Sequence, residues 1–320
     1  MEIRGKAPLR VSLTGGGTDL NYVFEKIGGA VTNMTINKYC HMGIRIRDDD
    51  DITVNGRELD LTNSKERLAK AIVLRTRPKF GFDLTYHNDI PPGSGLGSSS
   101  SFNVLMLRLL AEAQNRTPTD LELISEAHAI DVSLKEGGWQ DQYATALGGF
   151  NFMEFGSQTT VYPLRLRYGY LCDLMEHMTL VKIGEKDNED THQKVRIGYD
   201  RNATRPDIVS KLVRLKDLAY KTRDCLLNGR IAEIGPLIGE NWEIKRNPFT
   251  TTPEIDKLYD TARKAGATGG KLCGSGKAGH FLLFAQPSRK PSLLRKLQEE
   301  NYEVVPFDYT EHGVETWRTN

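Results

Sequence analysis

A Gly- and Ser-rich segment, Pro91-Pro92-Gly93-Ser94-Gly95-Leu96-Gly97-Ser98-Ser99-Ser100-Ser101, constrains the fold of this chain more than any other part of the sequence. Its alternating glycines let backbone amides approach a ligand without interference from a Cβ atom. The segment runs directly into a series of apolar residues between Phe102 and Leu110, which a flexible linker does not do. We therefore predict a tight loop that opens a helix over about Ser98 to Ala113. Free amides and the positive dipole end make such a helix start an anion-binding site.

The loop is not a Walker A sequence, because no window of the chain reads Gly-x-x-x-x-Gly-Lys-Ser/Thr. Instead, Pro-x-x-x-Gly-Leu-Gly-Ser-Ser, from Pro91 to Ser99, resembles the nucleotide loop of the GHMP kinases, which include galactokinases and mevalonate kinases. The resemblance implies a loop that wraps the phosphates of ATP, formed by Pro92, Gly93, Ser94, Gly95, Leu96, Gly97, Ser98 and Ser99. It also implies a hydroxyl ligand for Mg2+, which is Ser99 by position, with Ser98 as the alternative.

A second glycine turn, Gly15-Gly16-Gly17-Thr18-Asp19, lies near the N-terminus. Glycines allow a ligand to approach the backbone, and the carboxylate of Asp19 can accept hydrogen bonds from sugar hydroxyls. Taken alone, the pattern also fits a tight turn without a ligand. The form Arg-x-Ser-x-x-Gly-Gly-Gly-Thr-Asp is similar to the heptose 7-phosphate kinases and fucokinase-like enzymes of the same family. The resemblance implies that Gly16, Gly17, Thr18 and Asp19 hold the substrate, and that Arg10 stabilises charge on the transferred phosphoryl group.

A third glycine-rich segment begins near Gly269. Its part Gly274-Ser275-Gly276-Lys277-Ala278-Gly279 matches Gly-x-Gly-x-x-Gly, but a dinucleotide fingerprint opens a helix, and the apolar residues that follow predict a strand. The segment instead resembles the third GHMP motif, a hairpin that supports the ATP loop and borders the substrate, with Gly274 as the expected contact. The pair Lys277-Ala278 departs from the small residues of relatives. Whether Lys271, Cys273 or Lys277 touches a ligand stays open.

The segment Gln140-Asp141-Gln142-Tyr143 again resembles the heptose kinases. The resemblance makes Asp141 the catalytic carboxylate, together with Arg10. An aspartate beside the acceptor hydroxyl can orient it and take its proton during phosphoryl transfer. The alternative is a loop carboxylate without chemistry.

An acidic Mg2+ ligand is expected upstream, and Asp131 is the candidate, although relatives usually carry a glutamate at slightly longer spacing. Glu126 and Glu136 are the alternatives. A polar segment, residues 187–205, carries Lys194, Arg196, Arg201 and Arg205. These cations fit either a clamp for a distal sugar phosphate or an ordinary solvated loop.

Composition narrows the function classes. Lys and Arg number 43 and Asp and Glu 42, so a net charge of +1 gives no field that would recruit nucleic acid. No apolar run approaches the roughly 18 residues of a membrane span, and no signal peptide is expected. Four widely spaced cysteines fit reduced thiols and a cytoplasmic location. The seven histidines form no HExxH or Cys/His cluster, so no zinc site is predicted.

The expected fold class is α+β: a two-domain GHMP architecture with a ribosomal-S5-like N-terminal half, residues 1–168, and a ferredoxin-like C-terminal half, residues 169–320. Residues 3–13 read as a strand pair broken near Pro8, residues 30–47 as strand, and Asp48 to Asp51 as a solvated hairpin tip. Helices are predicted over residues 65–75, 121–135, 207–227, 231–243, 253–265 and 288–299. Further strands are predicted over residues 81–87, 178–182, 269–272, 279–284 and 303–307.

The resemblance implies an ATP- and Mg2+-dependent kinase of a small sugar, acting as a monomer or homo-oligomer without nucleic acid or membrane partners. The preferred acceptor is the anomeric hydroxyl of D-glycero-D-manno-heptose 7-phosphate. A kinase of free L-fucose or galactose, and a non-catalytic sensor of sugar and ATP, are the alternatives.

Overall fold

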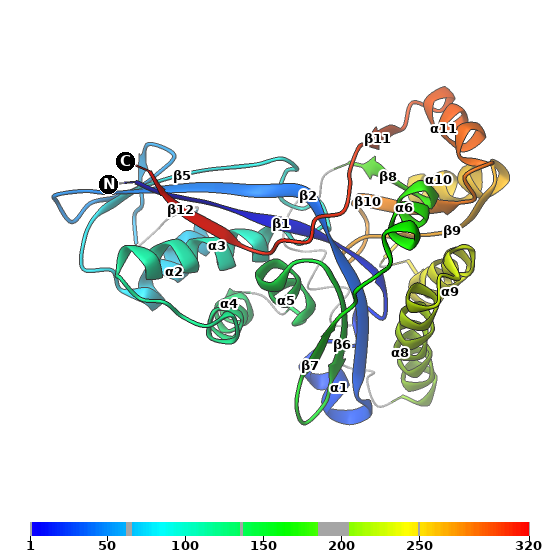
Figure 1. The fold of residues 1–320 in the computed structure, drawn as a ribbon, viewed down its shortest axis with the longest axis horizontal. Helices are drawn as coiled ribbons and strands as arrows, with labels where there is room; N and C mark the ends of the chain where they lie inside the picture. The colour runs from blue at the N-terminus through cyan, green and yellow to red at the C-terminus, as the bar shows by residue number, and fades with distance from the viewer. Residues whose placement is uncertain (1, 62–65, 135–136, 185–204, 249, 320) are drawn as a thin grey trace.

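Two long antiparallel strands, β1 (Glu2–Thr14) and β2 (Gly29–Ile46), run through the larger of two sheets (Figure 1). The computed structural model describes residues 2–61, 66–134, 137–184, 205–248 and 250–319. Within them the strand order of this sheet is β12-β1-β2-β5-β3-β4, and β6 pairs with β2 and β7. The other strands are β3 (Ile52–Val54), β4 (Arg57–Glu58), β5 (Phe82–Asn88), β6 (Phe150–Phe155), β7 (Thr160–Pro163) and β12 (Glu315–Thr319).

Two sequence predictions for this sheet are wrong. Strand β1 is one continuous strand, not a pair broken near Pro8. Proline lacks an N–H, and the β1–β2 register shifts between Pro8 and Leu9, so a bulge accommodates the proline without ending the strand. The exposed run from Asp48 to Asp51 is not a hairpin tip either, because β3 pairs in parallel with β5 instead of with β2.

Helices pack against one face of this sheet and enclose a hydrophobic core (Figure 1). They are α2 (Arg67–Thr76), α3 (Ser98–Ala113), α4 (Asp120–Leu134) and α5 (Gln140–Leu147). Helix α3 spans the predicted residues and lies against both β1 and β2. Its apolar side chains, such as Val104 and Leu109, are fully buried, which fixes the helix start close to the strands.

The smaller sheet has the strand order β11-β8-β10-β9. Its strands are β8 (Met178–Ile183), β9 (Ala267–Leu272), β10 (Gly279–Ala285) and β11 (Glu303–Val305). The helices of this half are α6 (Tyr168–His177), α8 (Pro206–Leu227), the 3-10 turn η1 (Ile231–Glu233), α9 (Ile234–Lys245), α10 (Pro253–Lys264) and α11 (Lys290–Glu299). The predicted helices and strands of this half are thereby confirmed to within a few residues; α6 was not predicted.

The two halves share a hydrophobic cluster. It joins Leu9 and Val11 of β1 to Ala219 of α8 and to Leu282 and Phe284 of β10. The chain then returns, because β12 pairs antiparallel with β1 and brings the C-terminus beside the N-terminus (Figure 1). The predicted domain boundary between residues 168 and 169 therefore stays a proposal. The last strand, β12, is part of the larger sheet because it pairs with β1.

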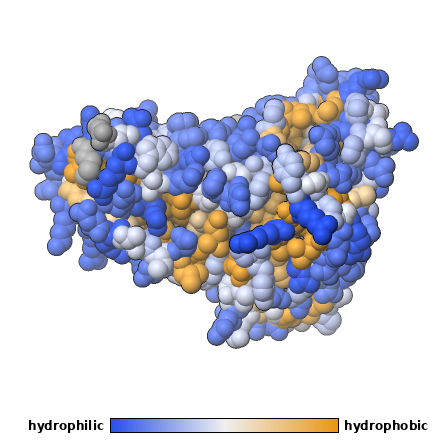
Figure 2. Space-filling view, in the orientation of Figure 1, coloured by the Kyte–Doolittle hydropathy of each residue, from blue (hydrophilic) through white to orange (hydrophobic). Residues whose placement is uncertain are grey.

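The surface carries both hydrophilic and hydrophobic residues. Figure 2 shows a mostly hydrophilic face on which hydrophobic residues gather along the middle of the molecule. In the part of the chain that the structure describes, no helix combines the length and apolar character needed to cross a membrane. All four cysteines are free thiols.

Candidate active site

The glycine loop before α3 has the geometry of an anion cradle. Gly93, Gly95 and Gly97 have φ angles of 82°, 77° and 83°, in the left-handed region that favours glycine. Helix α3 begins immediately afterwards at Ser98. Loop amides and the first amides of the helix are thus gathered at one place, as phosphate binding at a helix N-terminus requires.

The β9–β10 hairpin packs against this loop, backbone to backbone. A Cβ atom built on Gly95 would lie 2.3 Å from the carbonyl oxygen of Cys273, and one built on Gly274 would lie 2.6 Å from the Cα of Gly95. The ring Nδ1 of His280 lies 3.0 Å from the carbonyl oxygen of Ser94. These contacts require glycine on both sides, and they explain why two glycine-rich segments far apart in the sequence occur together.

Arg10 links β1, the loop and α5. Its Nε donates to Asp141 Oδ1 at 2.7 Å, and its Nη2 donates to Asp141 Oδ2 at 2.8 Å. Its Nη1 donates to the carbonyl oxygen of Gly95 at 2.7 Å, and its backbone N–H donates to Leu96. Burial works to lower the pKa of Arg10, but the adjacent Asp141 carboxylate raises it above its usual value. The side chain of Asp141 is 25% exposed, so the carboxylate is both fixed and accessible.

Asp19 lies buried beside the start of α5. Its Oδ1 accepts from the Gly17 amide at 2.9 Å, and its Oδ2 accepts from the Gln140 amide at 3.2 Å. A Cβ atom on Gly138 would lie 1.8 Å from Asp19 Oδ2, so any larger residue there would displace the carboxylate. Burial, and secondarily the nearby charge of Asp141, raises the pKa of Asp19.

The remaining turn residues hold the backbone in shape. The Thr18 hydroxyl lies 2.8 Å from the Gly15 carbonyl oxygen and accepts from the Ala30 amide at 3.0 Å. The Thr18 backbone N–H also donates to the Gly15 carbonyl oxygen and the residue is fully buried, so Thr18 shapes the turn, and its predicted contact with the substrate stays a prediction. At Gly16 an added Cβ would lie 3.0 Å from Ser12 Oγ, which leaves little space around this residue.

Two lysines enter the site from the C-terminal half. Lys245, at the end of α9, donates to the carbonyl oxygen of Gly16 at 3.0 Å, and burial lowers its pKa. Lys271, on β9, is 3% exposed and donates to the carbonyl oxygen of Ser12 at 2.6 Å. Burial lowers the pKa of Lys271 to about 7, with Lys245 and Arg10 contributing in the same direction. The site therefore gathers three basic side chains, Arg10, Lys245 and Lys271, near its two aspartates.

Sequence reasoning did not find Lys245, and it left Lys271 undecided. Lys245 stands in Glu243-Ile244-Lys245-Arg246, which carries no motif, so its position depends on how α9 packs on β9 and β1. Lys271 belongs to the third glycine-rich segment, but strand alternation alone does not reveal that its ammonium group turns toward Ser12.

Asp131 lies in a buried network between α3, α4 and α5. Its Oδ2 accepts from Gln142 at 2.6 Å and from Ser100 at 3.1 Å, and its Oδ1 accepts from Asn103 at 3.1 Å. The serine bonded to it is thus the neighbour of Ser99, one residue further along α3. A cation beside Ser99 would therefore compete with these donors for the oxygens of Asp131.

The other candidates lie elsewhere or are not described. Glu126 faces Arg75 of α2 at 3.8 Å. Lys277 has a φ of 65°, a conformation that favours glycine, which gives a physical reason for the small residues expected there. Arg205, which directly precedes α8, forms an ion pair with Asp207 in the first turn of that helix. Glu136, Lys194, Arg196 and Arg201 lie outside the described residues.

Comparison with known proteins gives a consistent result. The family described as "GHMP kinases N terminal domain" matches residues 65–149, and "GHMP kinases C terminal" matches residues 222–303. The D-glycero-alpha-D-manno-heptose 7-phosphate kinase of Campylobacter jejuni is 31% identical to this chain. The alignment is 343 residues long and covers 99% of each chain.

Solved structures agree with this match. A D-glycero-D-manno-heptose 1-phosphate kinase from Bacteroides thetaiotaomicron superposes with a TM-score of 0.79 at 29% identity, covering 99% of both chains. A galactokinase from Lactococcus lactis, complexed with galactose, has a TM-score of 0.76 at 17% identity over 98% of this chain and 95% of its own. The likeness to the galactokinase concerns the fold alone.

Proposed function

The chain belongs to the GHMP kinase family, and on this premise we propose that it is an ATP-dependent sugar kinase that phosphorylates the anomeric hydroxyl of D-glycero-D-manno-heptose 7-phosphate. The observation that carries the kinase proposal is the Arg10–Asp141 pair, which lies against the glycine loop through the contact of Arg10 with Gly95. The full-length similarity to a heptose 7-phosphate kinase supports the acceptor. Since ATP is the donor, the proposal places the reaction in the cytoplasm.

Asp141 acts on the acceptor. Its carboxylate orients the anomeric hydroxyl and accepts its proton as the new O–P bond forms and the bond between the γ-phosphorus and the β–γ bridging oxygen breaks, with ADP as the leaving group. Arg10 holds both oxygens of Asp141, which fixes the carboxylate. Because the guanidinium group also lies at the glycine loop, it places positive charge beside the transferred phosphoryl group.

The cradle for ATP consists of loop amides and the start of α3, from Pro92 to Ser99. Mg2+, when bound, neutralises phosphate charge during transfer. We assign Ser99 and Asp131 to this ion; hydroxyl and carboxylate oxygens are ligands that Mg2+ accepts. Asp131 would accept the ion in competition with Ser100, Asn103 and Gln142, which donate hydrogen bonds to it.

The sugar binds at the turn from Gly16 to Asp19, with the backbone near Gly274 on the opposite side. Asp19 accepts hydrogen bonds from sugar hydroxyls, while Gly17 and Gln140 hold its carboxylate. Lys245 and Lys271 add positive charge on the side of the C-terminal half. Positioning and electrostatics of this kind account for most of the catalysis in phosphoryl transfer.

The test is Mg2+-dependent release of ADP from ATP with a panel of acceptors: D-glycero-D-manno-heptose 7-phosphate, mannose, L-fucose, galactose and mevalonate. We expect turnover with the heptose phosphate and a 1,7-bisphosphate product by 31P NMR. Turnover that requires a free sugar would keep the kinase and replace the substrate. ATP and sugar binding without turnover on any acceptor would overturn the kinase and favour a sensor.

A further inference from the structure

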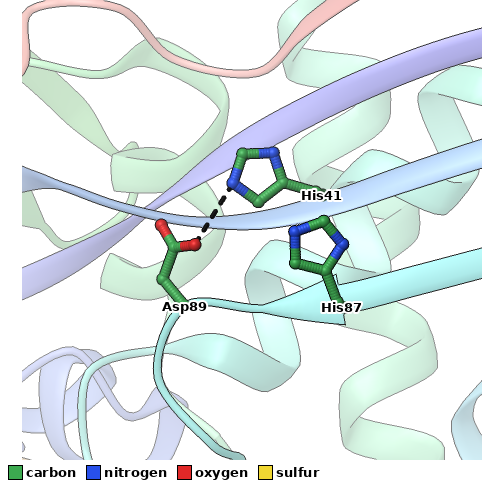
Figure 3. A group of neighbouring side chains, drawn as sticks. All are labelled: His41, His87 and Asp89. Atoms are coloured by element: carbon green, nitrogen blue, oxygen red, sulfur yellow. Dashed lines mark ion pairs between the residues drawn. The ribbon is translucent and has the colours of Figure 1, made fainter.

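His41, His87 and Asp89 form a cluster on the larger sheet that the proposed reaction does not use (Figure 3). His41 of β2 and His87 of β5 are direct cross-strand partners, and Asp89 follows the end of β5. The two imidazole rings are parallel, with centroids 4.6 Å apart and an interplanar angle of 9°. One ligand atom from each of the three side chains lies within 4.8 Å of the other two.

The carboxylate of the cluster is held in place by backbone. Asp89 Oδ2 accepts from the Tyr39 amide at 2.9 Å, and the Asp89 amide donates to the Tyr39 carbonyl oxygen at 3.0 Å. Asp89 Oδ1 is thereby turned toward His41, whose Nε2 lies 3.4 Å away (Figure 3). About a third of each of these two side chains is exposed, so the cluster is both ordered and open to solvent.

The cation of Lys6 lies next to the cluster. Lys6 of β1 is the cross-strand partner of His41. Its ammonium group lies 3.1 Å from Glu315 and 4.9 Å from the centre of the Tyr39 ring. Glu315 and the Tyr39 ring partly neutralise the positive charge of Lys6. They thereby reduce its repulsion of a metal cation bound by the imidazoles.

We propose that His41, His87 and Asp89 bind a divalent first-row transition-metal ion of the Zn2+ type. Imidazole and carboxylate are ligands that this class of ion prefers, and three protein ligands with one water complete a tetrahedron. Metal–ligand bonds of about 2.0–2.2 Å place tetrahedral ligand atoms about 3.4 Å apart. The lone pair of an imidazole nitrogen lies in the ring plane, so the two parallel rings must rotate out of their stacked arrangement to direct both nitrogens at one ion. Mg2+, which prefers oxygen ligands, does not compete here.

The position of the cluster connects it to the nucleotide loop. Asp89 lies two residues before Pro91, at the point where β5 leaves the sheet. An ion bound by His41 of β2, His87 of β5 and Asp89 would hold the start of the nucleotide loop against the larger sheet. Linear spacing could not reveal this site, since the histidines are brought together only by the register of β2 and β5.

The test is calorimetric titration of the untagged full chain with Zn2+ alone, in a Cys172→Ser background, because Cys172 is an exposed thiol and thiols also bind zinc. We expect one Zn2+ per chain. Replacing His87 by alanine should weaken binding by about tenfold or more, since loss of even an outer-shell partner costs that much. His312→Ala, which removes an exposed histidine outside the cluster, should leave binding unchanged.

Thermal unfolding gives a second readout. A bound ion raises the unfolding midpoint, so Zn2+ should stabilise the Cys172→Ser protein and His312→Ala but not His87→Ala. The proposal is overturned by the absence of saturable Zn2+ binding, or by equal affinities in the His87→Ala and His312→Ala variants.

Discussion

Arg10 and Asp141, 131 residues apart in the sequence, are joined by two parallel hydrogen bonds of 2.7 and 2.8 Å. Such a bidentate contact fixes the orientation of the carboxylate as well as its position. Arg10 is almost fully buried, while Asp141 keeps a quarter of its side chain exposed. A carboxylate held from the protein side and open on the other is suited to meet an acceptor hydroxyl.

Asp141→Asn should lower kcat by about 10² to 10⁴-fold, the usual contribution of a positioned general base. Affinity for ATP should change little, because the loop amides are untouched. Steady-state ADP release and nucleotide binding by calorimetry check this. The matched control is Asp50→Asn in the exposed loop after β2, which should retain full activity. Equal activity of the two variants would remove Asp141 from the mechanism.

Gly138→Ala should displace the buried carboxylate of Asp19, because the new Cβ would lie 1.8 Å from its Oδ2. A misplacement of about 1 Å at a substrate contact costs about 10²-fold in kcat/KM for the sugar. The neighbouring Gly137→Ala is the control, since nothing lies within 4 Å of a Cβ there. The proposed sugar-binding role of Asp19 fails if sugar kinetics are unchanged in Gly138→Ala.

Much of the fold was predictable because local patterns decide it. The helix over Ser98 to Ala113 is confirmed with its bounds, since a glycine start and a long apolar series both favour it. The helix α5 was missed: its eight residues, from Gln140 to Leu147, are too short and too polar to show a clear period. Strand β12 was also missed, because its partly exposed residues gain strand geometry from pairing with β1 at the other end of the chain.

The candidate site was predictable where residues belong to a motif. The sequence placed Arg10, Asp141 and the glycine loop in one mechanism, and the structure brings them into contact. Lys245 and the two histidines of the sheet cluster could not be found in this way. Their neighbours are set by helix packing and strand register, which depend on the whole chain.

Gly95→Ala should weaken ATP binding, because a Cβ would lie 2.3 Å from the Cys273 carbonyl oxygen and force the loop away from the hairpin. We expect the KM for ATP to rise by about tenfold, equivalent to about 1.4 kcal/mol. The control is Gly56→Ala, which has a similar φ of 76° but nothing within 4 Å. Both variants bear the cost of a left-handed alanine, so the Gly56→Ala control removes the general loss of stability from the comparison. Equal KM values for ATP would contradict a role of the hairpin contact.

Asp131→Asn should raise the Mg2+ concentration needed for half-maximal rate by about tenfold, as expected when a metal site loses a charged ligand. Glu126→Gln on the same helix is the control, because Glu126 lies by Arg75 of α2. The hydrogen bonds of Asp131 also predict a lower unfolding temperature for Asp131→Asn. A lower unfolding temperature with an unchanged Mg2+ requirement would leave Asp131 a purely structural role.

Lys271 should impose a basic limb on the pH profile of kcat/KM. Burial lowers the pKa of Lys271 to about 7, so its side chain is cationic below this pH and neutral above it. If the cation assists phosphoryl transfer, kcat/KM falls as the pH rises through about 7, because this parameter reports the free enzyme. Bound ATP is anionic and raises the pKa of Lys271, so the corresponding limb in kcat lies at higher pH.

Substitution of Lys271 shows whether the basic limb of the pH profile comes from this residue or from the titration of ATP. Lys271→Arg keeps the charge at all these pH values, so the limb should disappear while any limb due to ATP remains. Lys271→Met should give a lower rate without the limb. Unfolding temperatures of both variants establish that the buried site tolerates them. A basic limb that persists in Lys271→Arg belongs to another group, and Lys271 would then serve only to tie β9 to β1 through Ser12.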